Sequence, residues 1–128
     1  MLHTDLEDIL GKVRASLEVD DLAGAVAAIE ALRAPDQADL FYELDDQSQA
    51  ALLPRLDPED SADILEELED EDAARLVATL TREEAVRIID EMEPDEAAAL
   101  LVEMEPEDQE YVLSHLEDAA ELRPLLLH

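Results

Sequence analysis

Apolar residues recur along this chain with a period of twelve, and the register holds without an insertion or deletion from residue 32 to residue 116. Each unit opens on a leucine or methionine and has an aliphatic or aromatic pair at the eighth and ninth positions after the opening residue. Six positions after the opening residue most units have a small apolar residue, and Glu110 breaks this rule. The opening residues are Leu32, Leu44, Leu56, Leu68, Leu80, Met92, Met104 and Leu116; the pairs are Leu40-Phe41, Leu52-Leu53, Ile64-Leu65, Leu76-Val77, Ile88-Ile89, Leu100-Leu101 and Val112-Leu113. Seven consecutive units indicate a repeat architecture.

Each unit has the pattern of one short amphipathic helix, because apolar residues fall at i, i+3, i+4 and i+7. One long helix is excluded, since twelve residues at 3.6 per turn would rotate successive apolar faces by about 120°. Pro58, Pro94 and Pro106 all occupy the third position of their units. Proline suits the first turn of a helix and breaks its interior, so the chain must turn once per unit.

Helices of about ten residues are marginal alone, so each must stack on its neighbours. We therefore predict an all-α fold, a right-handed superhelix (solenoid) of short amphipathic helices with about 12-residue repeats. In most units the residue after the opening leucine or methionine is acidic or carries a hydroxyl. Two of these places resemble capping boxes, Asp57 with Asp60 and Thr81 with Glu84. We expect the leucines, methionines and pairs inside and the carboxylates outside.

Three segments are expected along the chain. Residues 1–31 are predicted to form a helical hairpin that caps the stack, with Thr4 opening a first helix and Asp21 a second. Residues 32–116 are the seven repeats. Residues 117–128 are predicted to be a C-terminal end at which the pattern fades, cut before the next element of a longer protein.

Charge narrows the possible partners. Eight basic residues against 37 acidic ones give a formal net charge of −29, and no lysine or arginine lies between Arg87 and Arg123. Such a surface repels nucleic acid and anionic lipid, so cations or basic protein surfaces are the expected partners. The chain has no cysteine, which excludes disulfides and thiolate metal sites and favours a cytoplasmic setting.

Neither an enzyme nor a membrane span is expected. No nucleophile elbow or phosphate-binding glycine loop is present, and Gly11 and Gly24 stand alone in helical segments. A convex solenoid surface is expected to offer no pocket that would shift carboxylate pKa values. His3, His115 and His128 are too scattered for a zinc site. No apolar run approaches the length of a membrane-spanning helix.

The unit L-x-P-E-x-x-A-x-[LI]-[LV]-x-x-L, preceded by a helical hairpin, resembles the N-terminal cytosolic domain of the MgtE family of magnesium channels or transporters, and the resemblance covers nearly the whole chain. It implies a superhelical domain on the cytoplasmic face of the cell membrane. In that family a pair of CBS domains and a homodimeric membrane pore follow. The resemblance implies that Mg²⁺ bound between the domains favours the closed pore. We expect the isolated domain to bind Mg²⁺ weakly, because half of each shared coordination shell is missing.

The resemblance also implies metal-binding residues. Carried over unit by unit, the acidic positions of the family's interface fall on Asp63 and on the segment 93–99, where Asp95 and Glu96 are acidic. Ala99 stands where the family pattern has a further acid, so at least one shared ion is in doubt. Asp95 is the first candidate, followed by Asp63 and Glu96.

Other interpretations stay open. Asp95 and Glu96 follow Pro94, where acids are expected from helix-end electrostatics alone. Acidity on this scale is also what a salt-rich cytoplasm selects, in which case it reports habitat and not a ligand. An alternative function is a protein-interaction solenoid without a metal role, like the helical repeats of flagellar motor-switch proteins.

Overall fold

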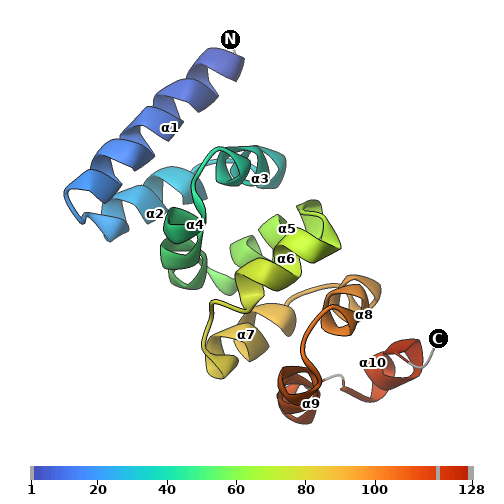
Figure 1. Cartoon of the computed structure of the whole chain (residues 1–128). Coiled ribbons are helices and arrows are strands. Elements are labelled where there is room, and N and C mark those ends of the chain that lie inside the picture. The colour runs from blue at the N-terminus through green and yellow to red at the C-terminus, as the bar shows by residue number, and fades with distance from the viewer. Residues whose placement is uncertain (1, 118, 127–128) are drawn as a thin grey trace.

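The computed structural model describes residues 2–117 and 119–126. Over these ranges it is entirely helical, and the helices run from α1 at one end to α10 at the other, with the two termini at opposite ends (Figure 1). The α-helices are α1 (Leu2–Glu18), α2 (Leu22–Glu30), α3 (Ala34–Tyr42), α4 (Asp46–Leu52), α5 (Pro58–Glu67), α6 (Asp70–Val77), α7 (Arg82–Ile89), α8 (Pro94–Val102), α9 (Pro106–His115) and α10 (Ala119–Leu126). A 3₁₀ turn, η1 (Leu53–Arg55), extends α4.

The helices begin at intervals of twelve residues, which confirms one helix per repeat. From α3 to α9 the first helical residues are Ala34, Asp46, Pro58, Asp70, Arg82, Pro94 and Pro106. The three prolines stand at the first position of their helices, where the missing N–H is not needed. The residue before each proline has a ψ between 135° and 145°, outside the helical region, as proline favours, and this sets the corner between units.

Each helix packs on the helix two units away. One row is α3, α5, α7 and α9, and the other is α4, α6, α8 and α10. Between the rows runs one continuous aliphatic core formed by the opening residues and the pairs. Phe41, Ile64, Leu100 and Leu101 are at most 1% exposed. The predicted interior is therefore confirmed, whereas the handedness of the superhelix stays a prediction.

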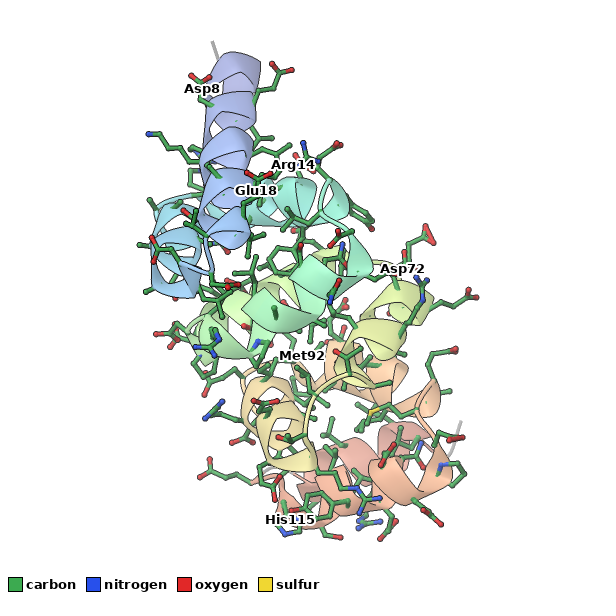
Figure 2. The ribbon with its side chains drawn as sticks, turned by 60° about the vertical axis from the view of Figure 1, so that its left-hand side comes forward. Asp8, Arg14, Glu18, Asp72, Met92 and His115 are labelled. Atoms are coloured by element: carbon green, nitrogen blue, oxygen red, sulfur yellow. The ribbon has the colours of Figure 1, made fainter. Side chains whose placement is uncertain are left out.

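Figure 2 shows the two kinds of position in one view: Met92 lies between the ribbons, and Asp8, Glu18 and Asp72 project outward. Met92 is 8% exposed, so a methionine replaces leucine in the core, as predicted. The opening residues Leu32, Leu80 and Met104 are only half-buried.

Polar side chains that are buried or half-buried bind the carbonyl groups at several corners between helices, a feature that the sequence did not predict. Gln37, Gln49, Ser61 and Gln109 occupy the same position, five residues after the opening leucine or methionine of their units. Each donates to the carbonyl eight residues earlier, at the end of the preceding helix; the Ser61 Oγ bond to the Leu53 carbonyl is 2.7 Å. These bonds satisfy carbonyl groups that the end of a helix leaves without a partner.

The hairpin before the repeats is formed by α1 and α2, which pack on each other. The Asp21 side chain accepts from the Gly24 amide and caps α2, as predicted. Asp20 makes the turn with a φ of 59°, a conformation that aspartate tolerates better than most residues. The predicted cap at Thr4 is wrong, because α1 already begins at Leu2.

The chain continues helically after the seventh repeat. Helix α10 packs on α8 and α9 and buries Leu122, which is 4% exposed. Leu122 occupies the position that is a small apolar residue in most repeats. A larger side chain there, with Pro124 inside the helix, explains why the sequence pattern fades although the fold continues. His128 lies outside the described residues.

Candidate functional site

Two groups of carboxylates surround the N-terminal turns of α5 and α8. The α5 cluster is Glu30, Asp57, Glu59, Asp60 and Asp63; the α8 cluster is Glu66, Glu67, Asp70, Asp95 and Glu96. Glu30 and Glu66, Glu59 and Asp95, and Asp60 and Glu96 are each 36 residues apart. Thirty-six residues are three units, so the two clusters are equivalent places on the superhelix.

A carboxylate from an earlier helix binds the amide at the start of each cluster. Glu30 Oε2 accepts from the Asp57 N–H at 2.8 Å, and Glu66 Oε2 accepts from the Glu93 N–H at 2.8 Å. Asp90 makes the same bond to the Glu117 N–H at 3.3 Å. Each bond crosses 27 residues and joins a helix to the start of the third helix after it. The fold therefore holds an acid against the first turn of α5 and of α8.

The third residue of α5 and of α8, Asp60 and Glu96, is a carboxylic acid with a raised pKa. Partial burial raises the pKa of Asp60 first, and Glu30, Asp57, Asp63 and Glu59 raise it further. Partial burial is likewise the largest cause of the raised pKa of Glu96. Asp95, Glu66, Asp70 and Glu67 add to it.

A helix N-terminus by itself favours the charged form of an acid. Both pKa values are nevertheless raised, so desolvation and repulsion between like charges win at Asp60 and Glu96.

The structure brings two of the three predicted site residues together. Asp95 and Glu96 lie in the first turn of α8, with Asp95 exposed and Glu96 half-buried. Asp63 is exposed on α5 and acts on Asp60, not on Glu96. Among the described residues, no three acidic or histidine side chains converge closely enough to hold a metal ion on their own.

Sequence reasoning missed Glu30 and Glu66. Both stand two residues before the opening leucine of the next unit, at a position that is also tyrosine, proline, alanine or valine in other units. The signal that could have found them is an acid placed 27 residues before a helix N-cap. That spacing has meaning only once the packing of the helices is known.

The two predicted capping boxes differ. At α7 the box is complete: the Thr81 hydroxyl accepts from the Glu84 amide, and the Glu84 carboxylate accepts from the Thr81 amide. At α5 the prediction is wrong for Asp60, since the Asp57 amide donates to Glu30 instead. Aspartate is one methylene shorter than the glutamate that this motif uses, and the long side chain from α2 takes the bond.

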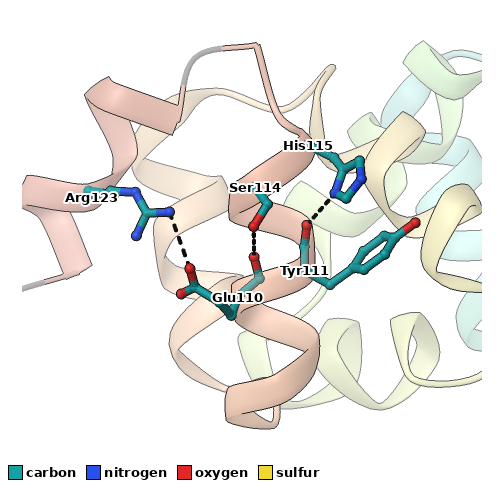
Figure 3. Close-up of polar contacts among 5 residues, drawn as sticks. All are labelled: Glu110, Tyr111, Ser114, His115 and Arg123. Carbon is teal, nitrogen blue, oxygen red and sulfur yellow. Dashed lines mark hydrogen bonds and ion pairs between the residues drawn. The ribbon is translucent and has the colours of Figure 1, made fainter.

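Arginine and aromatic side chains gather on α7 and α9. The His115 ring stacks on Tyr111 with centroids 4.2 Å apart, and its Nδ1 lies 2.8 Å from the Tyr111 carbonyl oxygen (Figure 3). Glu110, which breaks the small-residue rule, is exposed and pairs with Arg123 at 3.4 Å (Figure 3). Arg82 lies 5.3 Å from the Tyr111 ring centroid.

The surface is also hollowed, contrary to the expected convex shape. Between α6, α7 and the start of α9 lies a groove with a volume of about 530 Å³, and between the α3–α4 corner and α6 lies a smaller one of about 310 Å³. Both are open to solvent and share Arg75. Within the described ranges, no helix is long and apolar enough to cross a membrane.

Comparison with known proteins gives one family and one solved structure. The family model of the MgtE intracellular N domain matches residues 32–128. A structure described as "Crystal structure of the soluble part of a magnesium transporter" aligns with a TM-score of 0.79 at 24% identity, over 94% of this chain and 49% of that chain. The present chain thus spans about half the length of that protein. The comparison with curated proteins gives no match.

Proposed function

This chain belongs to the family of MgtE intracellular N domains, and from that membership we propose that it is the regulatory domain of a magnesium channel or transporter. In this proposal the domain lies on the cytoplasmic face of the membrane and responds to the Mg²⁺ concentration there. Its role is regulatory and not catalytic. Its partners are the CBS domains and the membrane pore of the same homodimeric protein.

The observation that carries the proposal is the crowding of carboxylates around Glu96 and Asp60. Partial burial is the largest cause of the raised pKa values, and repulsion from the neighbouring carboxylates adds to it, so negative charge is crowded at these places. A cation from solution would relieve that repulsion. Mg²⁺ suits the site because it takes carboxylate and water oxygens and needs only one or two carboxylates from a protein surface.

Asp95, Glu96 and Asp63 are proposed to supply part of the coordination, and an acidic surface of the CBS domains the rest. Two acidic surfaces repel each other until a divalent cation lies between them. A cation that binds only the docked state shifts the population toward docking by its difference in affinity for the two states. Docking is proposed to stabilise the closed pore when cytoplasmic Mg²⁺ is high.

The two clusters are not proposed to bind Mg²⁺ equally. Asp63 in the α5 cluster corresponds to Ala99 in α8, so the α8 cluster lacks one exposed acid. Glu67 and Asp70 contribute to the α8 cluster without a counterpart among the charges that act on Asp60. We therefore propose Asp95 as the first ligand and Asp63 as belonging to a second ion.

Thermal unfolding of this chain in MgCl₂ and in NaCl at matched ionic strength tests the proposal. A specific ligand at one hundred times its Kd adds about 2.7 kcal/mol to the free energy of unfolding, whereas screening alone acts equally in both salts. We expect higher melting temperatures in MgCl₂, rising with its concentration into the millimolar range. Identical curves in the two salts would contradict a magnesium-sensing role for this domain.

Asp95→Asn and Glu107→Gln form a matched pair of variants for this measurement. Both residues are exposed, both occupy the second position of a helix that begins with proline, and each substitution removes one negative charge. Asp95→Asn is expected to reduce the difference between MgCl₂ and NaCl, and Glu107→Gln to leave it unchanged. An equal reduction in both variants would mean a diffuse ion atmosphere and no site.

A further inference from the structure

The two grooves are the same structural feature repeated after 36 residues. Seven of the nine residues that line the smaller groove have a counterpart 36 positions later in the lining of the larger one. The pairs include Leu44 with Leu80, Leu68 with Met104, and Asp72 with Asp108. The larger groove also has lining residues without a counterpart in the smaller one, and several of the equivalent positions carry different residues.

Two substitutions between the equivalent positions replace large side chains with small ones in the larger groove. Tyr42 and Gln49 in the smaller groove correspond to Ala78 and Ala85 in the larger one. In the smaller groove the Gln49 amide is bonded to the carbonyls of Phe41 and Leu44 and occupies its own corner. Alanine at both positions removes these side chains and leaves a wider trough, whose wall includes the half-buried Leu80 and Met104.

The charge around the larger groove that has no ion-pair partner is negative. Its two arginines are already engaged, Arg75 with Asp72 and Arg82 with Asp108. Glu71, Glu103 and Glu105 line the same groove and are exposed. Among the described residues, none of these three carboxylates has a hydrogen bond or an ion pair through its side chain. An apolar trough with an uncompensated acidic rim selects an occupant with apolar anchors and positive charge.

We propose that the groove between α6, α7 and the start of α9 binds an amphipathic helix of a protein partner, with aliphatic residues on one face and lysine or arginine flanking it. A helix places apolar anchors at i, i+3, i+4 and i+7 into such a trough. A second copy of this chain is a poor occupant, because two surfaces of net charge −29 repel each other. This role is separate from Mg²⁺ sensing and does not require the cation.

The experiment uses this chain in EDTA, near physiological salt, with two fluorescein-labelled Leu/Lys peptides of identical composition. One places its leucines on a single helical face, and the other is scrambled so that no such face exists. We expect the amphipathic peptide to bind at least about tenfold more tightly, which corresponds to about 1.4 kcal/mol. We also expect it to shift the backbone NMR signals of Ala78, Ala85 and Met104. Equal affinity for both peptides, or shifts confined to the α5 and α8 clusters, would overturn the proposal.

Ala78→Tyr fills the groove with the residue found at the equivalent place in the smaller one. Ala78 is exposed at the end of α6, so tyrosine there is compatible with the fold. Ala78→Tyr is expected to lower the affinity for the amphipathic peptide at least about fivefold. Ala15→Tyr, on the exposed side of α1, is the control and is expected to leave that affinity unchanged.

Glu103→Gln with Glu105→Gln changes only exposed side chains and provides a second test. It is expected to lower the affinity and its salt dependence. Unchanged affinity in both groove variants would contradict the proposal. The proposal would also be contradicted if the chain self-associates and Ala78→Tyr abolishes that self-association, since a second copy of the chain would then occupy the groove.

Discussion

The α5 and α8 clusters are two versions of one arrangement, and their differences separate what the fold requires from what it tolerates. Both keep an acid on the amide of the N-cap residue, Glu30 on Asp57 and Glu66 on Glu93. Both keep a strained acid at the third helical position. They differ where a buried Ser61 becomes Ala97 and an exposed Asp63 becomes Ala99. Backbone anchoring is thus shared, while the exposed acid and the buried hydroxyl vary.

The largest expected effect tests whether the cores beneath the two clusters are equivalent. Ile64 and Leu100 are counterparts, 0% and 1% exposed. Truncation of either to alanine should lower the free energy of unfolding by about 3 kcal/mol, because a buried aliphatic side chain is replaced by a cavity. Urea denaturation of Ile64→Ala and Leu100→Ala measures both. A near-zero change in the free energy of unfolding at one site alone would show that the repeats contribute unequally to stability.

The buried hydroxyl of Ser61 gives the next largest effect. Ser61→Ala removes the bond to the Leu53 carbonyl, in a place without access to water, and should cost about 1 to 2 kcal/mol. The reverse change, Ala97→Ser, should cost less than about 0.5 kcal/mol, since the new hydroxyl can donate to the equivalent carbonyl of Ile89. Equal costs for the two substitutions would mean that volume matters here and hydrogen bonding does not.

Removal of the anchoring carboxylates should have a smaller effect. Glu30→Ala and Glu66→Ala each delete one exposed bond to a backbone amide, and we expect a loss of about 0.5 to 1.5 kcal/mol. Glu66→Gln keeps an acceptor and removes a charge beside Glu96, so its loss should be smaller than that of Glu66→Ala. Thermal unfolding at low ionic strength compares Glu66→Gln with Glu66→Ala. Identical losses of stability in the two variants would argue against a contribution from the bond between Glu66 and the Glu93 amide.

The smallest effect concerns pH. For Asp60 and Glu96 the folded-state pKa lies above the unfolded value, so the native state binds more protons than the unfolded state in that interval. Each residue therefore destabilises the fold above its folded pKa, and the penalty disappears as pH falls below the unfolded value of about 4. Asp60→Asn and Glu96→Gln should raise the stability at pH 7 by about a few tenths of a kcal/mol, because solvent screens both sites.

That gain should vanish as the pH falls to about 4, where the wild-type acids are protonated in both states. Denaturation midpoints of each variant and the wild type across this range measure it. A gain that persists unchanged at low pH would point to a cause other than charge. Glu107→Gln serves as the control, since it removes an exposed negative charge that belongs to neither cluster.

The regular part of the fold could be predicted because its causes are local. Twelve-residue spacing, proline at Pro58, Pro94 and Pro106, and helical periodicity each act within a single unit, and every repeat helix begins where they indicate. The capping box of Thr81 and Glu84 is local in the same sense and is confirmed. Near the chain ends these signals weaken, which is why the cap at Thr4 was wrong and the extent of α10 was not foreseen.

The candidate site depends on distances that sequence does not contain. Glu66 reaches the Glu93 amide only because α5 and α8 are brought together by packing. The larger groove could likewise not be predicted from one unit, because its lining has Ala78 where the smaller groove, three helices earlier, has Tyr42. The twelve-residue pattern places Tyr42 and Ala78 at the same position of their units, but only the structure shows that each lines a groove. Metal binding by Asp95, Glu96 and Asp63 stays a prediction.

The short range of these contacts has a consequence for how the molecule forms. Within residues 2–117 and 119–126, no side-chain hydrogen bond joins groups more than 29 positions apart. Chains with such local contacts close only small loops and fold quickly. A nascent polypeptide of this kind can build its layers one after another while synthesis is still under way, without waiting for its final residue.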